Sequence, residues 1–183
     1  LHNPVTRLFT GRLPLHYATA HYYFTKESGL QHLLHRAKYK GDKDLCVYLG
    51  RLMGQGLAES SWITEIDALV PLPLYAAREK ARGYNQSYLL CQGMAEIVSK
   101  PVLNNVVIRS GATESQTRKS RVERWQNMEG RFSLLDESKT AGKHLLLVDD
   151  VITTGATLES CGRTLLQAPE ASLSVATLCF SVS

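Results

Sequence analysis

The sequence lacks the features that mark several common classes of protein. Its four cysteines are scattered along the chain, and none forms a Cys-x-x-Cys pair. A zinc ribbon or a secreted disulfide scaffold needs clustered cysteines, so the pattern favours reduced thiols in the cytosol. No stretch approaches the roughly 18 uninterrupted apolar residues of a membrane span, and no signal peptide is recognisable. We therefore expect a cytoplasmic protein without a membrane partner.

The net charge and the absence of two common nucleotide-binding motifs limit the possible classes of protein further. The net charge is +4, which suits an anionic ligand such as a polyphosphate and leaves nucleic acid open as a partner. The Walker pattern G-x-x-x-x-G-K-[ST] and the dinucleotide pattern G-x-G-x-x-G are both absent. At 183 residues, the chain suits one α/β domain with a proper core.

Short apolar segments alternate with amphipathic ones along most of the chain. Strands separated by helices imply parallel pairing with right-handed crossovers, so we expect an α/β fold with an open, mainly parallel sheet flanked by helices. Residues 1–16 contain two prolines and a glycine and are expected to be a poorly structured lead-in, which assigns the domain to residues 17–183. The patterns predict strands at 17–24, 66–70, 106–108, 145–148 and 173–180, and helices at about 28–40, 42–58, 85–98 and 156–166.

The segment 145–157, with the sequence LLLVDDVITTGAT, carries the strongest functional signal. Its apolar residues predict a buried strand, and two aspartates follow at the edge where open parallel sheets bind ligands. The start of the next helix offers unpaired backbone N–H groups and a partial positive charge, which suit a phosphate. Two carboxylates would repel that phosphate unless they faced another group, such as the two hydroxyls of a ribose. The pattern therefore predicts a ribose 5-phosphate site made of Asp149, Asp150, Thr153, Thr154, Gly155, Ala156 and Thr157.

Two other interpretations explain less of this segment. In a purely structural interpretation, Asp149 and Asp150 end a strand, and Thr154 or Thr157 caps a helix. That interpretation accounts for the threonines but not for the paired acids. A phosphoacceptor receiver domain also has a strand that ends in two acids, but it needs a further Asp and a Lys on later strands. No Asp or Lys follows Asp150, so a receiver domain is excluded.

The same segment resembles the motif with which type I phosphoribosyltransferases bind 5-phosphoribosyl-1-pyrophosphate (PRPP). Nearly the whole chain, from about residue 17, is similar to the ComF/GntX group, competence-associated relatives of these enzymes. The likeness rests on LHRAKYKGD at 34–42, VPLPLYAAREKARGYNQ at 70–86, the polar loop 109–131 and the segment 145–157. It implies a type I phosphoribosyltransferase-like fold with a small N-terminal rim or hood. Members often carry an N-terminal zinc module on Cys-x-x-Cys pairs; this sequence has no such pair, and we assign no metal ligand.

The resemblance also implies roles for basic residues outside the motif. The segment 70–86 corresponds to the loop that contacts pyrophosphate, and a glycine beside basic residues near a helix start can hold a diphosphate. The loop 109–131 corresponds to the lid that closes over PRPP, where it would exclude water and neutralise the leaving group. Solvated surface charge is the alternative for both segments. We assign pyrophosphate binding to Pro73, Lys80, Arg82, Gly83 and Arg109, and catalysis to Asp149, Asp150 and Arg118.

These assignments predict a Mg²⁺-dependent transferase. Mg²⁺ would be held mainly through PRPP, since this ion takes few protein ligands at such sites. Ribose 5-phosphate would pass to an unidentified nitrogen nucleophile, with release of pyrophosphate. The alternative is a non-catalytic factor that senses PRPP or a nucleotide, or that handles single-stranded DNA in competence. The oligomeric state stays open, a dimer included.

Overall fold

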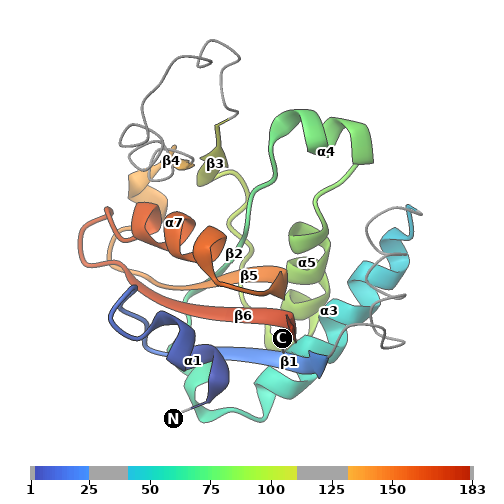
Figure 1. The fold of residues 1–183 in the computed structure, drawn as a ribbon, viewed down its shortest axis with the longest axis horizontal. Helices are drawn as coiled ribbons and strands as arrows, with labels where there is room; N and C mark the ends of the chain where they lie inside the picture. Colours follow the sequence, from blue (N-terminus) through green and yellow to red (C-terminus); the bar gives the residue numbers. More distant parts are fainter. Residues whose placement is uncertain (1–2, 25–40, 111–131, 182–183) are drawn as a thin grey trace.

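A computed structural model describes residues 3–24, 41–110 and 132–181 of the chain (Figure 1). Its centre is a sheet of four strands in the order β1-β6-β5-β2, in which every neighbouring pair is parallel. β5 and β6 lie in the middle of this sheet, whereas β1 and β2 form its edges. The strands are β1 (Ala18–Phe24), β2 (Ala68–Pro71), β5 (His144–Ile152) and β6 (Ser172–Ser181).

Helices cover both faces of the sheet and give the domain three layers (Figure 1). α1 and α7 pack on one face together with a small antiparallel sheet, β3-β4. α3 and α5 pack on the other face beside the 3-10 helix η1. None of the helices that the structure describes is long and apolar enough to cross a membrane. The bounds are α1 (Pro4–Phe9), α3 (Lys43–Ala58), η1 (Ser61–Glu65), α4 (Ala76–Arg82), α5 (Gln86–Val98), β3 (Val107–Arg109), β4 (Phe132–Leu134), η2 (Glu137–Lys139) and α7 (Ala156–Leu165).

β5 forms the centre of the core because both of its faces are covered. Leu145 and Leu147 belong to the apolar cluster that includes α1 and α7. Leu146 and Val148 belong to the cluster on the opposite face, with α3 and α5. All four side chains are fully buried. A strand covered on both faces is continuously apolar rather than alternating, which explains why the sequence signal for this strand is strong.

α3 and α5 approach each other closely because small residues face their neighbours. A methyl group at Gly93 of α5 would overlap the carbonyl oxygen of Val47 and lie 2.8 Å from the backbone nitrogen of Arg51 on α3. A methyl group at Gly50 of α3 would in turn overlap the backbone of Leu90. These two glycines therefore set the distance between the helices.

The N-terminal segment forms a helix, contrary to the prediction of a poorly structured lead-in at 1–16. Asn3 caps α1 by accepting a hydrogen bond from the backbone N–H of Thr6 at 2.8 Å. Pro4 occupies the start of the helix, where an N–H would have no intrahelical acceptor. Val5 and Phe9 are fully buried in the cluster that also contains the core strands. This segment thus shares a core with the rest of the described chain.

The predicted strand at 106–108 is also corrected. β3 pairs antiparallel with β4 and does not belong to the parallel sheet, and β4 itself was not predicted. An apolar run of three residues is too short to indicate which strand it pairs with or which sheet it joins. The side chain of Ile108, expected to be buried, is exposed. Part of the loop expected at 70–86 likewise forms the helix α4.

The remaining predictions agree with the structure apart from the ends of the elements. β1, β2, β5 and β6 are confirmed as strands, and α3, α5 and α7 as helices. β1, predicted at 17–24, lies at an edge of the sheet. The helix predicted at about 28–40 lies outside the described residues.

We expect Gly93→Ala to lower the free energy of unfolding by about 1–3 kcal/mol, because an extra carbon atom in a packed interface forces the backbone to shift. Urea denaturation followed by circular dichroism measures this change. Gln92→Ala, at an exposed position beside Gly93 on the same helix, is the matched control and should stay within about 0.5 kcal/mol of the wild type. Equal stability of the two variants would contradict the close approach of the helices.

Candidate functional site

The acidic pair lies in the last part of β5 rather than after it. Asp149 and Asp150 are both half-buried, and Asp149 sits opposite Thr177 of β6 in the sheet. Oδ1 of Asp149 accepts a hydrogen bond from the hydroxyl of Ser87 at 3.1 Å and another from the backbone N–H of Asp150 at 2.8 Å. Two donors from different elements thus fix the orientation of this carboxylate.

The loop 153–157 connects β5 to α7 and has the geometry expected of an anion-binding turn. Gly155 has φ +75°, a left-handed conformation that a residue with a side chain rarely adopts, and it is the N-cap of α7. Thr153, Thr154 and Ala156 are exposed, and Thr157 is half-buried. The backbone N–H groups of the first helical turn have no intrahelical acceptor. This loop therefore presents donors and hydroxyls beside the acidic pair.

The segment that follows β2 reaches the same edge of the sheet. β2 and β5 are parallel neighbours, and the backbone N–H of Leu72 donates to the carbonyl of Val148 at 2.9 Å. The buried Asn85 donates from Nδ2 to the carbonyl of Leu72 at 3.0 Å and accepts from the backbone N–H of Ser87 at 3.0 Å. Because Ser87 also holds Asp149, the two segments that the sequence singled out are joined by one hydrogen-bond network.

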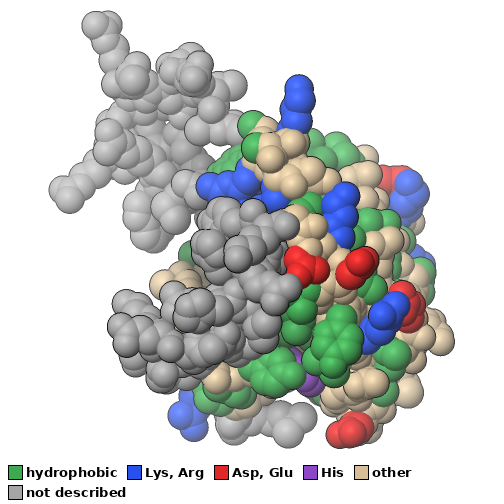
Figure 2. All heavy atoms as spheres, turned by 90° about the vertical axis from the view of Figure 1, so that its right-hand side faces the viewer, with side chains coloured by type: hydrophobic (Ala, Val, Ile, Leu, Met, Phe, Trp, Pro, Cys, Tyr) green, Lys and Arg blue, Asp and Glu red, His purple; other side chains and the backbone are tan. Residues whose placement is uncertain are grey.

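The carboxyl ends of the strands point to the right in Figure 1, and Figure 2 shows the molecule from that side. Acidic side chains lie near the middle of this face, with basic side chains close to them (Figure 2). Opposite charges thus lie close together on the face toward which the carboxyl ends of the strands point (Figure 2). A ligand that combines hydroxyls with phosphates needs such a mixture of acceptors and cations.

Lys80, Arg82 and Gly83 lie on or directly after α4, which stands away from the sheet (Figure 1). Lys80 is exposed, Arg82 is half-buried and donates to Oε1 of Gln86, and Gly83 ends the helix with φ +83°. These residues were expected in a loop, and the structure places them on a short helix instead.

The buried thiol of Cys46 is influenced both by Arg82 and by one member of the acidic pair. Burial raises the pKa of Cys46 to about 11, the carboxylates of Asp42 and Asp150 add to this rise, and the guanidinium of Arg82 opposes it. Asp150 and Arg82 therefore both act electrostatically on Cys46, a buried residue of α3.

Arg109 approaches the same region from β3. Its guanidinium lies 4.2 Å from the ring centroid of Tyr75 and 5.3 Å from that of Phe132, a geometry that favours cation–π attraction. Arg109 and Pro73 line one cleft of about 280 Å³. Burial raises the pKa of Cys161, Asp149 raises it further and Arg109 opposes the rise, so Arg109 and Asp149 both lie near this thiol.

Sequence reasoning missed the residues that support the predicted ones. Ser87 and Cys46 lie outside the segments that carry the family resemblance. Asp42 ends the segment 34–42 and Asn85 lies in the segment 70–86, but neither residue was assigned a role. Arg118, predicted to be catalytic, and most of the loop 109–131 lie outside the described residues. The site described here therefore consists of the acidic pair, the loop 153–157, and Pro73, Arg82 and Arg109 around them.

No group of three or more His, Cys, Asp or Glu side chains in the described ranges is arranged to hold a metal ion. The acidic pair supplies oxygen atoms, which are the ligands that Mg²⁺ prefers. Two carboxylates fit an ion that takes most of its ligands from a bound phosphate compound and from water rather than from a protein cage.

The parallel sheet, the acidic pair and the glycine turn before α7 together define a protein with a type I phosphoribosyltransferase fold. A family model described as "Phosphoribosyl transferase domain" matches residues 88–182, and the chain belongs to that family. The structure of the Bacillus subtilis glutamine PRPP amidotransferase, complexed with ADP and GMP, superposes with a TM-score of 0.54. That likeness covers 78% of this chain and 30% of the enzyme at 19% identity, so it shows the fold alone.

Curated relatives confirm the resemblance to the ComF/GntX group. Competence protein F of Haemophilus influenzae is 34% identical over 137 residues, which cover 73% of this chain and 60% of that protein. DNA utilization protein YhgH of Salmonella typhi is 33% identical over 150 residues, which cover 80% of this chain and 65% of that protein. The chain thus spans less than two thirds of the length of these relatives.

We expect Ser87→Ala to lower the free energy of unfolding by about 1.5–3 kcal/mol, because a half-buried carboxylate loses a hydrogen-bond donor. Chemical denaturation of the single and double variants with Asp149→Asn measures the coupling, and the effect of Ser87→Ala should shrink in the Asp149→Asn background.

Ser138→Ala is the matched control for this experiment. Ser138 donates a hydrogen bond of 2.6 Å to Asp136, but this pair is exposed, so its loss should change stability by less than about 0.5 kcal/mol. Equal changes in the free energy of unfolding for Ser87→Ala and Ser138→Ala would show that the bond between Ser87 and Asp149 does not stabilise the fold.

Proposed function

We propose that this chain binds PRPP at the edge of the sheet formed by the ends of β2 and β5. The observation that carries the proposal is the hydrogen-bond network from Leu72 through Asn85 and Ser87 to Asp149. Through it, a segment that resembles a pyrophosphate loop is joined to a segment that resembles a ribose 5-phosphate motif at the same edge of the sheet. A ligand with phosphates at both ends of a ribose would use both segments.

Each part of PRPP has a suitable group in this binding mode. The 5-phosphate lies against the loop 153–157, whose helix-start amides, hydroxyls and left-handed Gly155 suit a dianion. Asp149 and Asp150 accept hydrogen bonds from the ribose hydroxyls. The pyrophosphate is bound by the cations Lys80, Arg82 and Arg109, with Pro73 and Gly83 in the same segment as Lys80 and Arg82. Nε of Arg109 is a buried donor without an acceptor in the described part of the chain, so it is available to such a ligand.

Magnesium belongs to this proposal as a companion of the substrate. When bound, Mg²⁺ neutralises the pyrophosphate and lowers the energy of its departure. Asp149 and Asp150 would contribute oxygen ligands, and PRPP and water would supply the others. The protein's own cations, Arg82 and Arg109, would add positive charge near the pyrophosphate.

The reaction that this arrangement supports best is transfer of ribose 5-phosphate to a nitrogen nucleophile. The bond between C1 of the ribose and the pyrophosphate oxygen breaks, a bond between C1 and nitrogen forms, and the nitrogen releases a proton. The bonding electrons leave with the pyrophosphate. No protein nucleophile takes part, so the residues act by positioning and by stabilising charge. Arg118 stays the predicted third catalytic residue, beside Asp149 and Asp150.

The second candidate function is a role in handling DNA. It is favoured by the relatives, which are named competence protein F and DNA utilization protein. The net charge of +4 allows contact with the phosphates of single-stranded DNA. A binding protein of this kind would use PRPP or a nucleotide as a signal without turning it over. Both candidates fit a cytoplasmic protein, since all four cysteines are buried thiols.

We expect the wild-type chain to bind PRPP with Mg²⁺ in isothermal titration calorimetry. Asp149→Asn combined with Asp150→Asn should weaken binding roughly 10-fold or more, because two charged hydrogen-bond acceptors become neutral. Asp136→Asn removes one carboxylate charge at the start of η2, outside the proposed site, and should leave the affinity unchanged. Absence of binding by the wild type, or equal binding by the double variant, would refute the proposed site.

Turnover and DNA binding are separated by two further measurements. We expect release of pyrophosphate from PRPP in the presence of one member of a panel of nucleobases and amines. Binding of PRPP without release under every condition would favour the non-catalytic candidate. The DNA candidate requires that a labelled single-stranded oligonucleotide bind the chain in fluorescence anisotropy, with an affinity that falls steeply as salt rises.

A further inference from the structure

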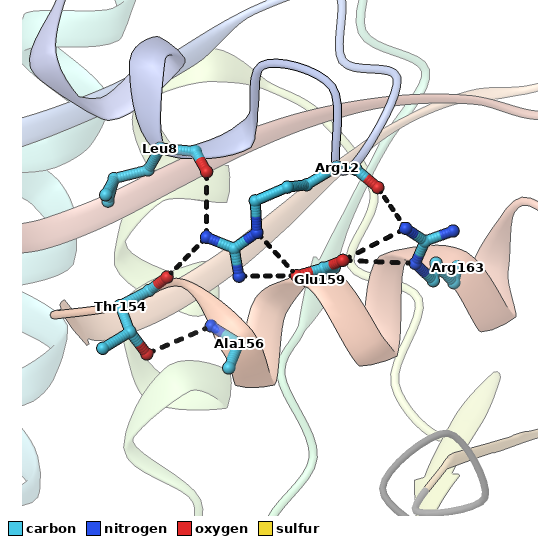
Figure 3. Close-up of polar contacts among 6 residues, drawn as sticks. All are labelled: Leu8, Arg12, Thr154, Ala156, Glu159 and Arg163. Carbon is cyan, nitrogen blue, oxygen red and sulfur yellow. Dashed lines mark hydrogen bonds and ion pairs between the residues drawn. The ribbon is translucent and has the colours of Figure 1, made fainter. Parts of the chain in front are cut away.

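The segment between α1 and β1 contacts the loop 153–157 through one side chain. Nη1 of Arg12 donates to the carbonyl of Thr154 and to the carbonyl of Leu8, both at 2.9 Å (Figure 3). Nε and Nη2 of Arg12 both donate to Oε2 of Glu159, at 3.0 and 2.6 Å. One guanidinium therefore joins the end of α1, the loop and the first turn of α7.

The geometry leaves Arg12 little freedom to move. A guanidinium has five N–H donors in a rigid plane, and four of the five are engaged by these acceptors. The contact with Glu159 is charge-assisted, which makes it stronger than a bond between neutral groups. Arg12 thus fixes the Thr154 carbonyl at a definite distance from α7.

Glu159 is held in turn by a second arginine. Arg163, one turn further along α7, donates to Oε1 of Glu159 at 3.1 Å and also to the backbone carbonyl of Arg12 (Figure 3). Burial alone would raise the pKa of Glu159, but the hydrogen bonds from Arg12 and Arg163 outweigh it and hold the pKa below its usual value. Glu159 therefore stays ionised and keeps Arg12 in place at neutral pH.

A packing contact acts on the same loop. A methyl group at Gly155 would lie 3.0 Å from the ring of Phe9, a fully buried residue of α1. The loop is thus backed by Phe9 at Gly155 and tied by Arg12 at Thr154. Both contacts come from the segment before β1, which no motif connects with a ligand.

We propose that Arg12 is a positioning residue that fixes the backbone of the loop 153–157 in the conformation that receives the phosphate of a ribose 5-phosphate. The conformational part of this inference stands on the described contacts alone. The phosphate part rests on the proposed function. Arg12 acts through the Thr154 carbonyl, and its guanidinium is paired with Glu159.

The rival explanation is that Arg12 serves only as a positive charge near an anion. The two explanations predict opposite signs for Glu159→Gln. If charge alone matters, removal of a carboxylate beside the loop strengthens the binding of a phosphate. If positioning matters, the same change weakens binding, because Arg12 loses its anchor and the Thr154 carbonyl loses its donor.

Hydrogen–deuterium exchange tests the conformational part without any ligand. Arg12→Gln and Glu159→Gln should speed exchange of the amides of Ala156 and residue 159 about 10-fold, because these amides donate to the Thr154 hydroxyl and to the Gly155 carbonyl of the loop. Exchange in the buried centre of β5 should stay unchanged and show that the fold is intact. Arg163→Gln, which removes an equal charge from the same cluster but no contact with Thr154, should change exchange less than about twofold. Unchanged exchange of the Ala156 and Glu159 amides in Arg12→Gln would overturn the inference.

Calorimetry with ribose 5-phosphate tests the phosphate part. Arg12→Gln and Glu159→Gln should each bind roughly 10-fold more weakly than the wild type, and Arg163→Gln within about twofold of it. Tighter binding by Glu159→Gln, or equal losses in Arg12→Gln and Arg163→Gln, would show that Arg12 acts as a charge and would overturn the positioning role. Failure of the wild type to bind either PRPP or ribose 5-phosphate would instead refute the proposed function. The exchange experiment would still test whether Arg12 fixes the conformation of the loop.

Discussion

The parallel pairing of β5 with β2 and β6 is the constraint on which the rest of the structure depends. A buried strand must satisfy its backbone groups on both edges, and β5 does so through neighbours that run in the same direction. Parallel neighbours end at one edge of the sheet, so the polar segments after β2 and at the end of β5 meet there. Helices on both faces then follow from the crossovers that parallel strands require.

At that edge, polar groups are held by partners from other elements. Ser87 fixes the Asp149 carboxylate, Asn85 fixes the segment after β2, and Arg12 fixes the Thr154 carbonyl. Carboxylates and arginines also share the surroundings of Cys46 and Cys161. A surface with such fixed donors and acceptors needs little rearrangement to receive a charged ligand, and that is the physical basis of the proposed function.

The sequence predicted the central sheet well because its strands are continuously apolar and separated by amphipathic helices. It failed where the signal is short or depends on distant partners. The run 106–108 could not reveal that β3 pairs with β4, and the prolines of the N-terminal segment concealed a helix that Asn3 caps. Val5 and Phe9 look unremarkable in the sequence, and only packing against the core strands gives them their role.

The sequence by itself determined the α/β class, the parallel sheet and the segment 145–157, because the strand, the acidic pair and the helix start are contiguous and their chemistry is local. The tertiary structure alone decided which residues support that segment. Ser87 lies 62 residues from Asp149, and Arg12 lies 142 residues from Thr154. Contacts over such separations leave no periodic or spaced pattern in a single sequence, since they depend on how β2, β5 and α1 are brought together by the burial of the core.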